Sequence, residues 1–88
     1  MTWRVEVQES ARKELRRLDK PIQARVLQFL RIRLASAEDP TRFGKPLRGG
    51  LAGLRRYRVG DYRILCLIDT EAQSLQVVAI GHRREVYR

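Results

Sequence analysis

The sequence predicts one α+β domain, residues 1–88, in which an antiparallel sheet packs under two N-terminal helices in the order strand, helix, helix, strand, strand, strand. Three observations support this class. The hydrophobic pattern changes from a two-residue to a helical period near the start of the chain. A stretch rich in glycine and proline, residues 36–54, then follows. The remaining residues form three strand-like runs, and a chain of 88 residues has room for a single core.

The first strand is predicted from apolar residues that alternate with polar ones, at Trp3, Val5 and Val7. Ser10 is the expected N-cap of the first helix because its hydroxyl can accept from free amides of the next turn. The apolar stripe of that helix is Ala11, Leu15 and Leu18.

The second helix is expected to begin at Pro21, because proline breaks the preceding helix and suits the opening turn of a new one. Its apolar face runs to about Ala35 and consists of Ile22, Val26, Phe29, Leu30 and Leu34. Residues 36–54 are then predicted to form an exposed connecting loop. The order of the strands in the sheet and the place of the first strand stay open.

A hairpin with a two-residue loop is predicted at Gly60-Asp61, where glycine supplies the positive φ of a type I′ or II′ turn. Counting outward from this loop pairs Arg58 with Arg63 and Arg56 with Leu65. Arg56, Arg58 and Arg63 should therefore project from one face of the sheet. The opposite, helix-covered face should carry Tyr57, Val59, Tyr62, Ile64, Cys66 and Ile68.

These three arginines form a candidate phosphate site. Guanidinium groups are permanently charged and make bidentate contacts with phosphate oxygens. Two like charges directly opposite each other disfavour folding, and a bound anion would remove that repulsion. The alternative is a solvated face, or arginines paired with carboxylates elsewhere in the chain.

The overall charge favours a polyanionic partner, since 19 Lys and Arg stand against 10 Asp and Glu, a formal net charge of +9. RNA, DNA and an acidic protein all qualify. Cys66 and His82 are too few to build a zinc site, and one cysteine forms no intrachain disulfide, so no metal or other cofactor is expected. Neither a signal peptide nor a membrane span is expected, which predicts a cytoplasmic protein without a membrane partner.

Two segments resemble the RelE/ParE toxin family of type II toxin–antitoxin systems. They are Arg56-Tyr57-Arg58-Val59-Gly60-Asp61-Tyr62-Arg63-Ile64-Leu65 and Gly81-His82-Arg83-Arg84-Glu85-Val86-Tyr87. The resemblance extends over the whole chain, because that family has the same order of elements. It implies a RelE-like messenger-RNA endonuclease that acts in the ribosomal A site without a metal, driving a ribose 2′-hydroxyl onto the adjacent phosphate.

The resemblance also implies roles for individual residues. Arg63 matches the arginine that holds the scissile phosphate, Arg83 the arginine that stabilises charge, and Tyr87 the terminal catalytic tyrosine. The remaining positions are expected to contact RNA phosphates, with Arg56 too basic to accept a proton; they are Arg56, Arg58, His82 and Arg84. A packing role for Tyr87 at the chain end is the alternative.

Two other functions remain open on the sequence. One is a ParE-like inhibitor of DNA gyrase, and the other is a catalytically silent module that binds nucleic acid or an acidic protein. In each toxin reading the resemblance implies a cognate antitoxin, with which the chain would form a hetero-oligomer, and messenger RNA is the expected substrate of the RelE-like form.

Overall fold

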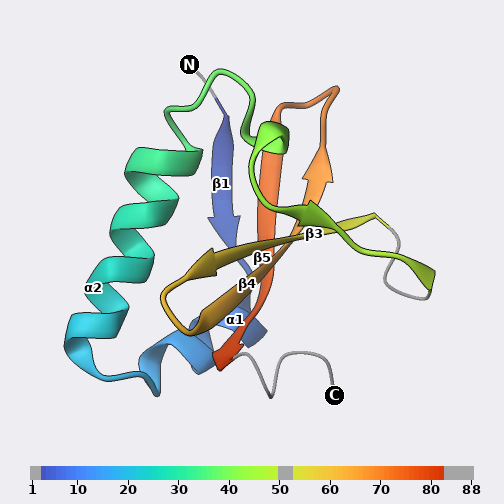
Figure 1. The fold of residues 1–88 in the computed structure, drawn as a ribbon. Coiled ribbons are helices and arrows are strands. Elements are labelled where there is room, and N and C mark those ends of the chain that lie inside the picture. Colours follow the sequence, from blue (N-terminus) through green and yellow to red (C-terminus); the bar gives the residue numbers. More distant parts are fainter. Residues whose placement is uncertain (1–2, 50–52, 83–88) are drawn as a thin grey trace.

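The structure, a computed structural model, describes residues 3–49 and 53–82 (Figure 1). It contains two α-helices, a π-helical turn, a 3₁₀ turn and a five-stranded sheet. The elements in chain order are β1 (Arg4–Val7), α1 (Glu9–Arg16), α2 (Lys20–Gln28), η1 (Phe29–Leu34), η2 (Pro40–Arg42), β2 (Lys45–Pro46), β3 (Leu54–Val59), β4 (Tyr62–Asp69) and β5 (Ser74–His82).

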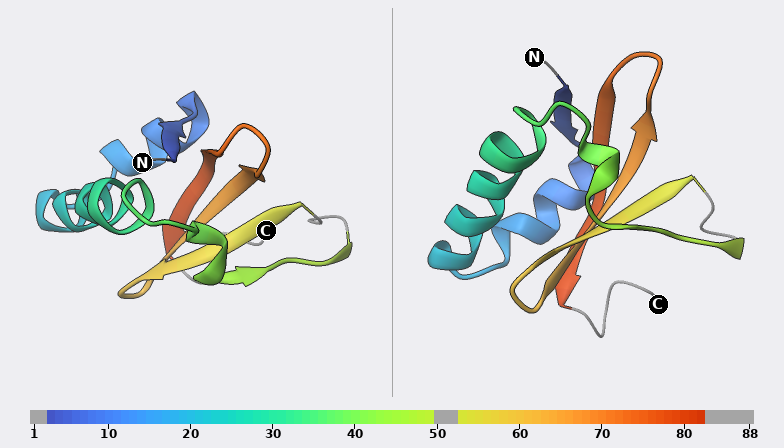
Figure 2. Two further views of the ribbon diagram at one scale, coloured as in Figure 1. Left: turned by 90° about the horizontal axis from the view of Figure 1, so that it is seen from above. Right: turned by 45° about the horizontal axis from the view of Figure 1, so that its top comes forward.

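The strands lie in the order β1-β5-β4-β3-β2. The pairs β5–β4, β4–β3 and β3–β2 are antiparallel, whereas β1 lies parallel to β5 at one edge. The predicted α+β class and the two helices on one face are confirmed (Figure 2). The sheet is mixed rather than wholly antiparallel because β1 joins it through a long connection, which permits a parallel pair.

Helix α1 begins at Glu9, immediately after β1, and its N-cap is Gln8. The amide of Gln8 donates to the carbonyl of Val77 at 2.9 Å, so the strand pairing continues up to the helix. Ser10 lies inside the first turn, and its hydroxyl donates to the Val78 carbonyl of β5 at 3.1 Å. The predicted Ser10 cap was therefore wrong: the hydroxyl binds the neighbouring strand instead of the helix amides.

The second helix starts at Lys20, with Pro21 in its first turn as predicted. It continues through η1, where the amide of Ala35 donates to the carbonyl of Leu30 in the wider π-helical spacing. Val26, Leu30 and Leu34 are buried, so the predicted apolar face is the one that packs on the sheet.

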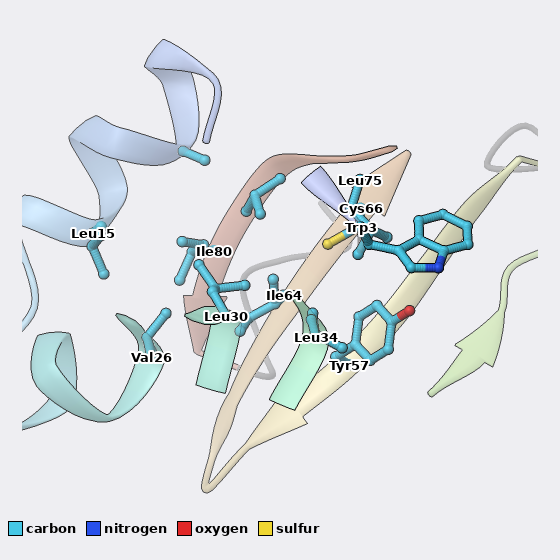
Figure 3. Packing of buried hydrophobic residues seen from close by; sticks show 12 residues of the cluster. Trp3, Leu15, Val26, Leu30, Leu34, Tyr57, Ile64, Cys66, Leu75 and Ile80 are labelled. Carbon is cyan, nitrogen blue, oxygen red and sulfur yellow. The ribbon is translucent and has the colours of Figure 1, made fainter. Parts of the chain in front are cut away.

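A single hydrophobic core lies between the helices and the sheet (Figure 3). Leu15, Val26, Leu30 and Leu34 approach from the helical side, and the sheet contributes the residues Tyr57, Ile64, Cys66, Leu75, Val77 and Ile80. Burial raises the pKa of the Cys66 thiol to about 12, so this cysteine is a protonated core residue at neutral pH.

The connection after η1 is more ordered than a loop of its composition predicts. Pro40 is buried, and its carbonyl accepts a 2.8 Å hydrogen bond from the Tyr57 hydroxyl. The indole Nε1 of Trp3 donates to the Glu38 carbonyl at 3.2 Å. The expectation of a fully exposed loop was wrong for this half, because two buried aromatic donors need acceptors and find them here.

Strand β5 contains a β-bulge opposite the Leu65–Cys66 step of β4. Leu65 pairs with Ala79 and Cys66 pairs with Val77, which leaves Val78 as the extra residue. The bulge changes the alternation along β5, so that Leu75, Val77 and then Ile80 are buried. Residues 79–82 therefore lie on the face opposite to the one that simple alternation predicts.

Candidate functional site: the arginine face of the sheet

The β3–β4 hairpin has the predicted register. Arg58 pairs with Arg63, Arg56 with Leu65 and Val59 with Tyr62. Gly60 has a φ of 60°, whereas the φ of Asp61 is not positive. Of the two predicted turn types, I′ and II′, this combination fits type II′. A rigid two-residue loop thus fixes where the arginines project.

Arg56, Arg58 and Arg63 lie on the side of the sheet turned away from the helices, which we call the outer face. Paired residues share a face, so the register places one row of residues beside another across β3, β4 and β5. The first row is Arg58, Arg63 and Gly81, and the second is Arg56, Leu65 and Ala79. Gly81 adds no side chain beside Arg63, which leaves the guanidinium room on the β5 side.

The outer face is not uniformly polar. Leu65, in the middle of the second row, is only 4% exposed. Arg58 is exposed, while Arg56 and Arg63 are half-buried, and the Nε atom of Arg63 is shielded from solvent. Arginine stems cover apolar surface well, so this arrangement places cationic groups over an apolar surface that is partly shielded from water. Charges interact more strongly with an anion at such a site than they do in open water.

Only two ion pairs join the side chains that the structure describes, Arg4 with Glu6 on β1 and Arg16 with Glu9 on α1. Arg58, therefore, has no carboxylate partner among residues 3–49 and 53–82, and its nearest charged cross-strand neighbour is Arg63. The arrangement suits an anionic ligand better than it suits a purely structural role.

His82 lies on the other face. It pairs with Tyr62, and the two rings meet edge to face with centroids 5.8 Å apart. The bulge at Val78 causes this placement because it reverses the alternation before His82. The structure thus brings Arg56, Arg58 and Arg63 together but does not bring His82 to the outer face. Arg83, Arg84 and Tyr87 lie outside the described residues.

The residues that hold β5 beyond the end of β1 could not be predicted from the sequence. The carboxylate of Glu14 accepts from the Ile80 amide at 2.8 Å, one helical turn from the contact between Ser10 and Val78. The spacing of Ser10 and Glu14 places them on one side of α1. Nothing in the local sequence identifies these contacts, because they depend on how α1 crosses β5.

No cluster of three or more His, Cys, Asp or Glu side chains placed to hold a metal ion occurs in the described part of the chain. None of the helices in that part is long and apolar enough to cross a membrane.

A small α+β fold with a cationic, helix-free sheet face corresponds to a recognised class of protein. A family model described as ParE toxin of type II toxin–antitoxin system, parDE, matches residues 5–87. The chain therefore belongs to the RelE/ParE family of type II toxin–antitoxin toxins, as its two sequence segments indicated.

Individual relatives agree with this assignment. The chain is 38% identical to toxin RelG of Mycobacterium tuberculosis over 88 residues, which is 100% of this chain and 99% of RelG. It is 35% identical to toxin RelE of the same organism over 86 residues, covering 98% of this chain and 87% of the relative. Among solved structures, the toxin–antitoxin complex RelBE2 of M. tuberculosis contains a chain with a TM-score of 0.86 and 36% identity, matched over 94% of this chain and 100% of that one.

Proposed function

We propose that this toxin is a ribosome-dependent messenger-RNA endonuclease, which inhibits translation by cutting RNA in the ribosomal A site, and hence acts in the cytoplasm. The observation that carries the proposal is the outer face, where Arg58 and Arg63 oppose each other on a rigid hairpin with Arg56 one row away. The names of the RelG and RelE relatives also support a RelE-like function.

The proposed reaction needs no metal. The ribose 2′-hydroxyl attacks the adjacent phosphorus, the bond from phosphorus to the 5′-oxygen of the next nucleotide breaks, and a cyclic phosphate and a 5′-hydroxyl result. Negative charge builds up on the phosphate oxygens in the transition state. Preorganised guanidinium groups stabilise that state more than the substrate, and this difference accelerates the reaction.

Arg63 is the residue we assign to the scissile phosphate, because it is central in its row and is flanked by Arg58 and Gly81. Arg56 and Arg58 bind neighbouring phosphate oxygens. By their match to the family pattern, Arg83 stabilises the developing charge and Tyr87 transfers or positions a proton, while Arg84 contacts the RNA backbone. Because His82 lies on the other face of the sheet, we propose that it contacts a phosphate only where the RNA extends past the edge of the sheet.

An antitoxin is the proposed protein partner. The similar chain from M. tuberculosis was solved in a toxin–antitoxin complex, and the present chain combines a high positive charge with a small core. A disordered, acidic segment that folds on binding would neutralise the outer face and stabilise the toxin.

Cleavage mapping tests the proposal. Purified toxin is added to messenger RNA that is being translated and to the same RNA free in solution, and the ends of the products are determined. We expect cuts only in the translated RNA, with a cyclic phosphate upstream and a 5′-hydroxyl downstream. An intact translated RNA, with the toxin folded and in excess, would refute the proposal.

The ParE name of the matching family model favours a second candidate, inhibition of DNA gyrase. A supercoiling assay run beside the cleavage assay separates the two. Loss of gyrase supercoiling together with intact messenger RNA would favour the gyrase reading.

A further inference from the structure

A groove of about 360 Å³ lies at the edge of β3, between this strand and the turn η1. Strand β2 covers β3 only at Arg55 and Arg56, so the groove opens where this pairing stops. Its volume is within the range of about 300 to 1,000 Å³ usual for small-ligand pockets.

One wall of the groove is aromatic. Phe43 follows η2, Tyr57 is the buried residue of β3, and Phe29 contacts the Tyr57 ring with centroids 5.9 Å apart. Tyr57 is only 1% exposed, whereas Phe29 and Phe43 are half-buried, so the phenylalanine rings are the ones that can offer a stacking surface to a base of a single-stranded nucleic acid.

A cation is already held against this wall. The guanidinium carbon of Arg33, from η1, lies 4.3 Å from the centroid of the Phe43 ring. A stacked guanidinium keeps its N–H donors in its own plane, where they remain available to a phosphate. Arg33 therefore spans the groove from the helix to the loop with its side chain preorganised.

Gly44 brings the loop against the strand. Its φ is +71°, and a Cβ built there would lie 2.3 Å from the Arg56 carbonyl oxygen and 2.9 Å from Cδ1 of Tyr57. Only glycine fits, so the position of Phe43 and Lys45 relative to β3 follows from packing. The packing of Gly44 against β3 therefore fixes the shape of the groove.

The charged side chains that line the groove are all cationic in the described part of the chain: Arg33, Lys45, Arg56 and Arg58. Arg56 and Arg58 also belong to the outer face, so the groove is continuous with the proposed scissile-phosphate site. A path of cations beside aromatic rings is the arrangement that follows a single-stranded RNA backbone and stacks its bases.

We propose that this groove binds a nucleotide of single-stranded RNA next to the scissile phosphate, with its base against Phe43 and its phosphate on Arg33 and Lys45. The inference rests on the proposed function. It assigns to the groove a share of RNA affinity, while the outer-face arginines perform the chemistry.

Binding of a non-cleavable probe tests the groove apart from cleavage. The probe is a fluorescein-labelled single-stranded RNA with 2′-O-methyl groups, measured by fluorescence anisotropy. We expect Arg33→Ala and Phe43→Leu each to weaken binding about fivefold or more, the scale for one stacked base. Arg33→Ala should also reduce the salt slope of log K by about 0.7, which corresponds to one phosphate contact on a single strand.

Arg31→Ala is the matched control, because Arg31 is an exposed arginine of the same turn that lines a different groove, beside β1. It removes the same charge, and we expect its affinity to stay within about twofold of wild type with an unchanged slope. Circular dichroism checks the fold of each variant. If Phe43→Leu does not fold, the exposed Arg33 side chain still provides the test.

An abasic scan of the probe adds a readout that a general loss of charge does not change. One abasic position should weaken binding to wild type and have no further effect on Phe43→Leu. If Arg33→Ala and Phe43→Leu bind the probe as Arg31→Ala does, the groove inference is overturned, even where wild type cleaves translated RNA. If the groove variants lose RNA binding but wild type cleaves nothing, the groove stands and the proposed function fails.

Discussion

Arg58 and Arg63 oppose each other directly across the β3–β4 pair, an arrangement that disfavours folding by a few tenths to about 1 kcal/mol. A neutral polar pair on the same face would avoid this cost. An anion bound between the two guanidinium groups would remove the repulsion. At the scale of single residues, this pair of arginines therefore supports the proposed phosphate site.

Cys66 supports a prediction about alkaline pH. Burial raises its pKa to about 12 in the folded protein, above the ordinary value of 9.0. Between these values the unfolded thiol loses its proton while the folded thiol keeps it, so the free energy of unfolding should fall as pH rises. The limiting slope for one group is about 1.4 kcal/mol per pH unit.

Urea unfolding of wild type and Cys66→Ala from pH 8 to pH 11 measures this effect. The variant should be less stable at pH 8 but lose less stability as pH rises. Burial also raises the pKa of the Tyr57 phenol, so part of the slope should remain. Identical pH dependence in the two proteins would contradict the assignment.

At the scale of elements, helix α1 binds the edge of β5 beyond the point where β1 ends. β1 pairs with β5 only as far as Val77, and Ser10 and Glu14 then bind the backbone carbonyl of Val78 and the backbone amide of Ile80. This contact holds the strand that leads into Gly81 and His82. On the side where β1 has ended, the end of β5 is therefore held by helix side chains, while β4 pairs with it on the other side.

Glu14→Ala should destabilise the protein by about 1 to 3 kcal/mol, because it leaves the amide of the buried Ile80 without its acceptor. Glu14→Gln keeps an acceptor oxygen and should lose less. Urea unfolding gives the free energies, and hydrogen exchange of the Ile80 amide should accelerate in the alanine variant only. Unchanged protection of that amide in Glu14→Ala would show that the contact is not formed.

The hairpin could be predicted from sequence because its register depends on two adjacent residues, Gly60 and Asp61, and on local alternation. The place of β1, the bulge at Val78 and the Glu14 contact could not. Each depends on segments more than sixty residues apart in the chain or on packing between elements. For the same reason, the family resemblance that gave His82 a phosphate contact did not show that the bulge turns this residue to the other face.

At the scale of the whole molecule, the two faces of the sheet have different tasks. The inner face and the helices form the single core, and the outer face and the groove beside it carry cations. With a net charge of +9, the protein should attract RNA over long range.

This charge predicts a strong salt dependence of RNA binding. For contacts with about three to five phosphates of a single strand, log K should fall with log salt at a slope of roughly −2 to −3.5. Titration of a labelled, non-cleavable RNA with potassium chloride measures the slope. A flat response would rule out phosphate contacts as the main source of affinity.

The central claim is that the outer face holds the scissile phosphate, and Arg63→Ala tests it most directly. Its effect on the free energy of unfolding should stay within about 1 kcal/mol, since lost packing of the stem opposes the relief of repulsion with Arg58. Arg31→Ala, which removes an exposed arginine from η1, is the control for charge.

The measurement is the rate of cleavage of translated messenger RNA by wild type, Arg63→Ala and Arg31→Ala, with circular dichroism to confirm folding. We predict that Arg63→Ala cleaves about a hundredfold more slowly or worse, the scale for loss of one preorganised transition-state donor, while Arg31→Ala cleaves at nearly the wild-type rate. A folded Arg63→Ala protein that cleaves as fast as wild type would contradict the account.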